Sequence, residues 1–244
     1  MKSKTSAPRR ILLVEDHPIV REGLKLVLQV GGEFEVCAEC ADKACAMRAL
    51  DTGRPDAAII DLSLQGASGL DLIKDIRAHG HRLPILVLSV NDEALYAERA
   101  LKAGAQGYLM KEEKADRLIA ALRRVLDGDI HVSEAISARM IGRMVNHPRS
   151  RSGTGVDTLS DRELEIFDRI GRGETTAEIA ANLRVSVKTV ETHRAHIRQK
   201  LGIRNGHELV HFAIRWIDSD GRAAARPAKP RSGISAGSAS ARRR

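Results

Sequence analysis

The chain has 244 residues, with 40 lysines and arginines against 32 aspartates and glutamates, which gives a formal net charge of +8 at pH 7. Hydrophobic residues make up 43% and charged residues 30%, proportions that exclude a disordered or fibrous chain. No apolar run approaches the roughly 20 residues that cross a bilayer. The basic N-terminus leads into a short apolar run at 11–14, whereas a secretory signal needs about 7–15 apolar residues. We therefore expect a cytoplasmic protein that makes no membrane contact.

The positive charge is concentrated in the second half of the chain. Residues 11–130 contain 15 basic and 20 acidic side chains, whereas 131–219 contain 14 and 11, and 220–244 contain 7 and 1. A polyanion would therefore meet the second half. The segment 218–244 lacks periodicity and is rich in Ala, Ser, Arg, Gly and Pro, so we expect a disordered basic tail. It either attracts phosphates without sequence preference or is only solvated.

The three cysteines, Cys37, Cys40 and Cys45, are too few for a secreted disulfide framework. Cys37 and Cys40 form a CxxC pair inside a predicted strand, where three steps of about 3.3 Å separate their Cα atoms by nearly 10 Å and turn the side chains to opposite faces. A disulfide needs Cα atoms within about 7 Å. We expect Cys37 and Cys40 to be small packing residues rather than a redox or zinc pair.

From residue 9 to 127, short apolar runs alternate with amphipathic stretches. Five strands alternating with five helices predict a parallel sheet covered on both faces, an α/β doubly wound fold. In such a fold, ligands bind at the carboxyl ends of the strands. The predicted strands are 11–14, 34–39, 57–60, 85–90 and 107–110.

Polar side chains stand where these strands end. Glu15 and Asp16 follow the first strand, Asp61 follows the third, Ser89 ends the fourth, and the fifth leads into Lys111. Three neighbouring carboxylates repel one another and so predict a positive partner, and Mg²⁺ suits oxygen ligands and phosphate oxygens. A carboxylate can also attack phosphorus. The pattern predicts an aspartate that is phosphorylated with magnesium as a clamp, although one such residue alone would usually be simple solvation.

The runs LLVEDHPIVREGL, AIIDLSLQGASGLDLIKDIR and PILVLSVNDEALYAERALKAGAQGYLMKEE resemble the receiver domain of bacterial two-component response regulators. The resemblance implies a flavodoxin-like fold with strand order 2-1-3-4-5 and phosphorylation of Asp61 by a sensor histidine kinase. Glu15 replaces the aspartate common in the family, which could shift metal affinity slightly. For Tyr108, a half-buried strand aromatic is the alternative to a switch residue. The implied metal ligands are Glu15 through water, Asp16, Asp61 and the carbonyl of Ser63, and the implied switch and phosphate-binding residues are Ser89, Lys111 and Tyr108.

The second half reads as a linker followed by a small all-α domain. We predict a receiver at 9–127, a partly helical linker at 128–157 and four short helices at 158–217. Ser160 and Thr175 are each followed three residues later by Glu, which fits a capping box. A short helix, a tight turn and a longer basic helix that starts after Ser186 form a helix-turn-helix pattern, whose second helix can enter the major groove.

The stretch LSDRELEIFDRIGRGETTAEIAANLRVSVKTVETHRAHIRQKLGIRNGHELVHFAIRW closely resembles the LuxR-type helix-turn-helix, and with a receiver it gives the NarL/FixJ group. This implies double-stranded DNA as a partner. Glu191 stands where many members have lysine; it either reads a cytosine or pairs with Lys188 and Arg194 on the helix surface. Gly206 replaces a frequent polar residue, and His193 and His196 are not expected to bind zinc. The implied base-facing residues are Lys188, Glu191, Thr192 and Ala195, and the implied phosphate contacts are Thr189, Arg194 and Arg198.

Three functions compete at this point. The first is a transcription regulator, switched by phosphorylation, that dimerises on two DNA half-sites and is no enzyme beyond its own phosphotransfer and dephosphorylation. The second is a phosphohydrolase with an aspartate nucleophile, which would need a carboxylate where Ser63 stands. The third is a phosphorylation-controlled protein-interaction adaptor without specific DNA binding, and a salt-dependent DNA shift assay separates it from the first.

Overall fold

A five-stranded parallel sheet forms the centre of the first half of the chain in this computed structural model, which describes residues 7–64, 68–146 and 155–218. The strand order is β2-β1-β3-β4-β5, which confirms the predicted order and all five predicted strands. The strands are β1 (Arg9–Val14), β2 (Phe34–Cys40), β3 (Ala57–Ile60), β4 (Ile85–Ser89) and β5 (Gly107–Met110).

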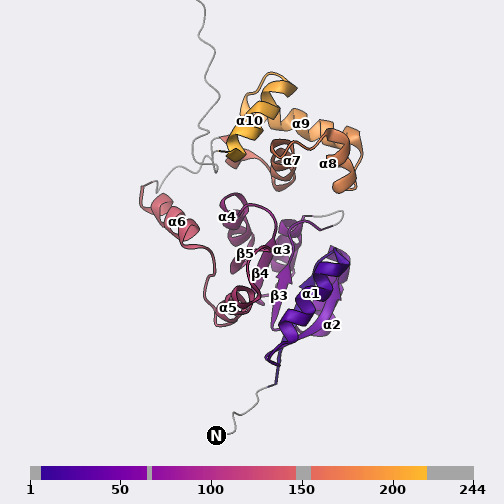
Figure 1. Cartoon of the computed structure of the whole chain (residues 1–244), viewed down its shortest axis with the longest axis vertical. Helices are drawn as coiled ribbons and strands as arrows, with labels where there is room; N and C mark the ends of the chain where they lie inside the picture. Colours follow the sequence, from indigo (N-terminus) through magenta and orange to yellow (C-terminus); the bar gives the residue numbers. More distant parts are fainter. Residues whose placement is uncertain (1–6, 65–67, 147–154, 219–244) are drawn as a thin grey trace, which may run out of the picture.

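Five helices cover the two faces of the sheet (Figure 1). Alternate residues of β1 point to opposite faces: Leu12 and Val14 pack with the apolar side chains of α2, α3 and α4, whereas Ile11 and Leu13 pack with those of α1 and α5. The continuous apolar runs of β1, β3 and β4 are therefore buried on both sides, as expected for a parallel sheet. The helices are α1 (Pro18–Gln29), α2 (Lys43–Gly53), α3 (Gly69–Ala78), α4 (Glu93–Ala103) and α5 (Ala115–Leu126).

The segment after α5 packs beside the sheet before the chain continues to the C-terminal part. His131 pairs with Gly107 beside β5: its N–H donates to the Gln106 carbonyl at 2.9 Å, and its own carbonyl accepts from the Tyr108 N–H at 2.8 Å. Helix α6 (Glu134–Asn146) then packs against α4, with Ile136 buried. The predicted helical character of the linker is confirmed by α6, while residues 147–154 of the predicted hinge lie outside the described residues.

The C-terminal part contains the four predicted helices. Both predicted capping boxes are present, at Ser160 and Thr175, and Ser186 caps α9 by accepting from the Thr189 N–H. Phe167 packs against Phe212 and Trp216 in the core of this part. The domain limits stay predictions, and the predicted tail lies outside the described residues from 219 onward. The elements are the 3-10 turn η1 (Gly155–Thr158) and helices α7 (Asp161–Gly171), α8 (Thr176–Asn182), α9 (Val187–Leu201) and α10 (Gly206–Asp218).

The cysteines correct one expectation. Cys37 is free and is not joined to Cys40, as predicted, but Cys40 forms a disulfide with Cys45, with the Cα atoms 5.4 Å apart. Cys40 is therefore more than a packing residue. The reason is the tight turn at 41–42, which reverses the chain between β2 and α2 and brings Cys45 back to the end of the strand.

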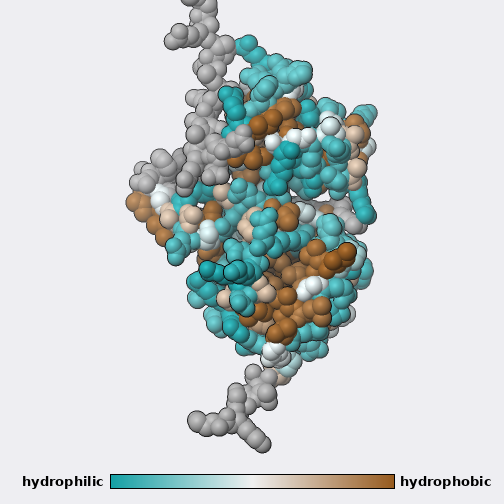
Figure 2. Space-filling model, viewed as in Figure 1, coloured by the Kyte–Doolittle hydropathy of each residue, from teal (hydrophilic) through white to brown (hydrophobic). Residues whose placement is uncertain are grey.

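Apolar side chains also reach the surface over α1, where Figure 2 shows a brown patch. Ile19, Leu26 and Val30, seven and then four residues apart, are 88%, 65% and 78% exposed. The seven-residue spacing places Ile19 and Leu26 on one side of α1, and Val30 follows the helix as its C-cap residue. Within the described residues, no helix combines the length and the apolar character needed to cross a membrane.

Candidate functional site

Glu15, Asp16 and Asp61 meet at the carboxyl end of the sheet, as predicted. β1 pairs with β3 in register, and the Asp61 N–H donates to the Val14 carbonyl at 2.9 Å, which places the residues that follow both strands side by side. All three carboxylates are buried, with Glu15 and Asp61 only 1% and 2% exposed. Ligand oxygens of these residues lie within 4.8 Å of one another.

Lys111, at the end of β5, joins the cluster. Its Nζ donates to Glu15 Oε2 at 2.6 Å and to Asp61 Oδ2 at 2.8 Å. Burial lowers the pKa of Lys111, but the carboxylates of Asp61 and Glu15 outweigh burial, so its pKa is raised and the ammonium stays charged. Burial raises the pKa of Asp61, against the opposing effect of Lys111. The ammonium group of Lys111 therefore forms ion pairs with two buried carboxylates.

The cluster fits a divalent cation. Three carboxylates face one ammonium, which leaves an excess of negative charge in a buried site. Among the described residues, Oδ1 of Asp16 is buried without a hydrogen-bond partner. Nδ1 of His17 lies 2.8 Å from it as an ion pair but makes its hydrogen bond to Glu15 Oε1. This unpaired carboxylate oxygen and the two neighbouring carboxylates together offer the oxygen ligands that Mg²⁺ prefers.

A hydrogen-bonded chain connects the cluster to α4. Ser89 is fully buried, and its Oγ accepts from the Asn91 N–H at 3.1 Å. The Tyr108 hydroxyl donates to the Asn91 carbonyl at 2.7 Å, and Asn91 Nδ2 donates to Ser63 Oγ at 3.5 Å. Tyr108 is 1% exposed, and this burial raises its pKa. Asn91, just before the N-cap of α4, is a functional candidate that no sequence pattern indicated.

Gly69 lies close against the backbone at the end of β3. Its N–H donates to the Leu62 carbonyl at 2.8 Å, at the start of α3. A Cβ atom at position 69 would lie 2.2 Å from the Asp61 carbonyl oxygen. Only glycine therefore allows α3 to begin this close to the end of β3.

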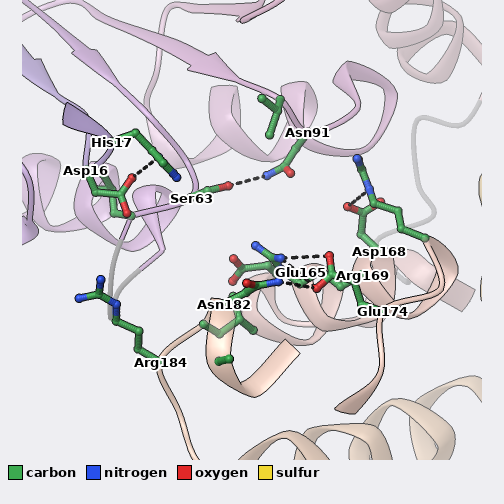
Figure 3. A pocket seen from close by; sticks show the side chains of 15 residues that line it. Asp16, His17, Ser63, Asn91, Glu165, Asp168, Arg169, Glu174, Asn182 and Arg184 are labelled. Carbon is green, nitrogen blue, oxygen red and sulfur yellow. Dashed lines mark hydrogen bonds and ion pairs between the residues drawn. The ribbon is translucent and has the colours of Figure 1, made fainter. Parts of the chain in front are cut away.

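The C-terminal part packs over this edge of the sheet, and a cavity of about 510 Å³ remains between the two. Figure 3 shows Asp16, Ser63 and Asn91 on one side of this cavity and Arg169 and Arg184 on the other. The structure therefore places α7, α8 and the following turn opposite the acidic cluster.

A second set of side chains ties the two parts together. From α4, Arg99 Nη1 donates to Asp161 Oδ1 at 3.0 Å and to the Leu159 carbonyl at 2.8 Å, and Nη2 donates to the Val156 carbonyl at 3.2 Å. Lys74 of α3 pairs with the other oxygen of Asp161. We refer to Lys74 and Arg99 with residues 156–161 as the interdomain contact. No local sequence pattern predicts this contact, because nothing in the spacing of residues marks an arginine that crosses to another domain.

The four predicted base-facing residues lie on the surface of α9. Lys188, Glu191, Thr192 and Ala195 are all exposed, so the first half of the chain does not cover these side chains. The predicted phosphate contacts are less open: Thr189 takes part in the N-cap of α9, and only 16% of the Arg194 side chain is exposed. Arg198 is half-buried.

Glu191 has a partner that the sequence did not suggest. Its Oε1 accepts from Thr176 Oγ1 of α8 at 3.0 Å and lies 3.6 Å from Arg194 Nε. The carboxylate thus bridges the two helices of the helix-turn-helix, in addition to the i,i+3 pair expected with Arg194.

His193 and His196 lie close to Glu163, so that one ligand atom of each could share an ion. The carboxylate of Glu163 is already engaged, however. Its Oε2 accepts from Lys200 Nζ at 2.6 Å and from the Ser160 N–H at 2.7 Å. Through these two hydrogen bonds the Glu163 carboxylate links the start of α7 to α9.

Comparison with known proteins matches both parts of the chain. The family described as response regulator receiver domain covers residues 11–123, and the luxR family of bacterial regulatory proteins covers residues 157–213. The oxygen regulatory protein NreC of Staphylococcus epidermidis is 36% identical over 211 residues, which are 84% of this chain and 97% of that protein. NreC of Staphylococcus aureus is 34% identical over 210 residues, with the same coverage.

Solved structures resemble the chain as well. RcsB of Salmonella enterica serovar Typhimurium, bound to promoter rprA with the phosphomimetic BeF3-, is 26% identical with a TM-score of 0.55; the match covers 84% of this chain and 97% of that one. A LuxR-family two-component response regulator of Aurantimonas is 33% identical with a TM-score of 0.52, over 57% of this chain and 99% of the other.

Proposed function

The chain belongs to the bacterial response regulators that join a receiver domain to a LuxR-type DNA-binding domain, and from this premise we propose how its residues perform the switch. A sensor histidine kinase and double-stranded DNA are its partners, and it regulates transcription. Asp61 is the phosphoacceptor in this proposal. The observation that carries the assignment is the buried ion pair of Asp61 with Lys111, beside two further carboxylates.

Asp61 Oδ would attack the phosphorus of the kinase phosphohistidine, forming an acyl phosphate and releasing neutral histidine. Asp16, Asp61 and the carbonyl of Ser63 would hold Mg²⁺, with Glu15 acting through water. The ion, when bound, supplies positive charge for the phosphoryl oxygens. Lys111, already beside Asp61, would pair with one of these oxygens. The receiver would take part only in its own phosphotransfer and dephosphorylation, in the cytoplasm.

The route from Asp61 to the DNA-binding domain would run through α4. Ser89 would turn its hydroxyl toward the phosphoryl group and so release Asn91, whose carbonyl holds Tyr108. Asn91 stands next to the N-cap of α4, and the same helix carries Arg99 of the interdomain contact. Phosphorylation would therefore loosen the interdomain contact.

Phosphorylation is expected to promote DNA binding by releasing the DNA-binding domain from the receiver, and not by uncovering α9. The base-facing side chains of α9 are already exposed, so the contact would oppose binding by fixing the orientation of the domain. Two copies in a phosphorylated homodimer must present α9 to half-sites about one helical turn apart. DNA-binding domains released from their receivers can adopt that spacing, whereas domains fixed to their receivers cannot adjust their position to the two half-sites.

The exposed apolar side of α1 is the proposed docking surface for the kinase. Ile19 lies three residues from Asp16, so a partner helix on this side would bring its phosphohistidine to the acidic cluster. Replacing Leu26 with serine should slow transfer from the kinase and leave phosphorylation by acetyl phosphate unchanged. Equal slowing with both donors would contradict the docking role.

Intact mass after incubation with acetyl phosphate and Mg²⁺ tests the acceptor. The wild-type protein should gain one phosphoryl group, stable in acid and labile in base, and Asp61→Asn should gain none. Asp71→Asn, on the exposed first turn of α3, is the matched control and should behave as wild type. Equal phosphorylation of Asp61→Asn would overturn the assignment. Asp16→Ala should lose phosphorylation together with Mg²⁺ binding.

A further inference from the structure

The disulfide between Cys40 and Cys45 lies beside the acidic cluster. Cys40 is the last residue of β2 and is 2% exposed, whereas Cys45 is only partly buried, in the first turn of α2. The third cysteine, Cys37, is separate: its Sγ donates to the Ile11 carbonyl at 3.5 Å. The fold therefore selects one pair of the three sulfurs, with the Cα separation of 5.4 Å that a disulfide requires.

The two sulfurs differ in their access to solvent and in their electrostatic surroundings. Cys45 is the third residue of α2, and its N–H donates to the Asp42 side chain, which caps the helix. The positive end of the helix favours a thiolate there, while the Asp42 carboxylate opposes it. Cys40 is buried at the end of the strand. In the dithiol form, a small oxidant would therefore meet Cys45 first.

We propose that Cys40 and Cys45 form a reversible oxidation site that takes a small-molecule disulfide such as oxidised glutathione. The Cys45 thiolate attacks one sulfur of glutathione disulfide, which forms a mixed disulfide and releases one glutathione thiolate. The Cys40 thiol then loses its proton and attacks Cys45 Sγ, which forms the Cys40–Cys45 bond and releases the second glutathione. Two protein thiols are oxidised and one glutathione disulfide is reduced to two thiols. An excess of reduced glutathione reverses both steps.

Oxidation would act on the acidic cluster through the backbone. The Cys40 carbonyl accepts from the Glu15 N–H at 2.9 Å, and Cys40 pairs with Val14 in the sheet. The disulfide fixes this end of β2 to the start of α2 across a short loop. Reduction removes that cross-link and gives the backbone partner of Glu15 more freedom. The dithiol form should therefore bind Mg²⁺ less tightly, a consequence that rests on the proposed acceptor site.

Peptide mapping of the full chain tests the chemistry. The protein is equilibrated at a series of reduced to oxidised glutathione ratios, alkylated with N-ethylmaleimide and cut with trypsin. Cleavage after Lys25, Lys43 and Arg48 puts Cys37 and Cys40 on one peptide and Cys45 on another. The linked pair should increase with oxidised glutathione and disappear when the ratio is reversed.

Three variants assign the sulfurs and their order. Cys37→Ala should keep the linked peptides. Cys40→Ala should lose them and accumulate glutathione on Cys45, whereas Cys45→Ala should leave Cys40 largely unmodified. The proposal is overturned if the link never forms in the folded protein, if reduced glutathione cannot open it without denaturant, or if Cys40 is modified as readily as Cys45.

Calorimetric Mg²⁺ titration tests the consequence. Reduced wild-type protein and Cys45→Ala should bind Mg²⁺ several-fold less tightly than oxidised wild-type protein, and oxidised Cys37→Ala should match the oxidised wild type. Equal affinity in both redox states would refute the coupling of the disulfide to the cluster. Loss of Mg²⁺ binding in both states would instead refute the proposed acceptor site and leave the peptide result standing.

Discussion

Removing the Arg99 side chain should release the DNA-binding domain from the receiver. Arg99 and Asp161 are 19% and 13% exposed, so their ion pair is partly shielded from solvent, and Arg99 also donates to three backbone carbonyls. Hydrogen bonds to charged groups contribute about 1.5–3 kcal/mol, whereas fully exposed ion pairs contribute about 0–1. We expect Arg99→Ala to weaken the free energy of the interdomain contact by about 2 kcal/mol. This shifts the equilibrium between packed and released domains toward release by roughly 30-fold.

Hydrogen–deuterium exchange measured by mass spectrometry reports this equilibrium. Peptides from α4 and from η1 should exchange faster in Arg99→Ala by up to roughly 30-fold, while peptides from β3, in the core, should not change. Arg123→Ala is the matched control, because the Arg123–Glu33 ion pair lies on the surface of the receiver. Unphosphorylated Arg99→Ala should bind the promoter more tightly than unphosphorylated wild-type protein, by no more than the same factor of roughly 30.

A double-mutant cycle isolates the pair itself. Asp161→Asn also removes the Lys74 partner and a charge at the start of α7, so its effect alone is ambiguous. With both changes combined, the coupling between Arg99 and Asp161 should be about 1 kcal/mol. Additive effects, or unchanged exchange of α4 and η1 in Arg99→Ala, would refute the role assigned to the interdomain contact.

Three further predictions follow from the site. Gly69→Ala should lower the free energy of unfolding of the receiver in urea by about 1–3 kcal/mol, because its Cβ would overlap the Asp61 carbonyl oxygen. Gly23→Ala, in open space on α1, should not destabilise the receiver, and equal effects of the two changes would contradict the reasoning. Glu191→Gln should relax the preference at one base pair per half-site by roughly 1–3 kcal/mol in binding-site selection; an unchanged motif would leave Glu191 as a bridge to α8. Glu165 and Asp168 of α7 line the cavity between the two parts, and burial raises the pKa of both carboxyls against the opposing charges of Arg162 and Arg172. Their protonated forms therefore favour the packed arrangement, so domain packing should strengthen as pH falls through these raised pKa values and weaken as pH rises, and scattering profiles of the double variant Glu165→Gln, Asp168→Asn should lose that dependence.

The sheet and the convergence of the acidic side chains with Lys111 could be predicted from the sequence for a simple reason. Runs such as 57–60 are apolar throughout and are bounded by polar residues, and parallel strands bring their carboxyl ends to one edge. Once the strands were placed, Asp61, Glu15 and Lys111 had to converge. Chain direction alone puts each of them on this edge, whereas their adjacency depends on the strand order, which the family resemblance implied.

Contacts that depend on tertiary geometry could not be predicted in this way. The turn before α2 decides that Cys40 meets Cys45, and its shape is not visible in the spacing of the cysteines. Asn91 becomes important because its loop passes between Ser63 and Tyr108. The bond from Thr176 to Glu191 crosses between helices and so has no periodic signal.

The pairing of His131 beside β5 limits how two copies of this chain can associate. An uncovered edge strand offers its N–H and carbonyl groups to any extended polypeptide, and many proteins are joined by strand addition. Here the edge beside Gly107 and Tyr108 is already occupied by the chain itself. A second copy cannot extend the sheet at this position without first displacing the linker. Self-association at this side must therefore rely on complementary side-chain surfaces, which a change in receiver conformation can create or abolish.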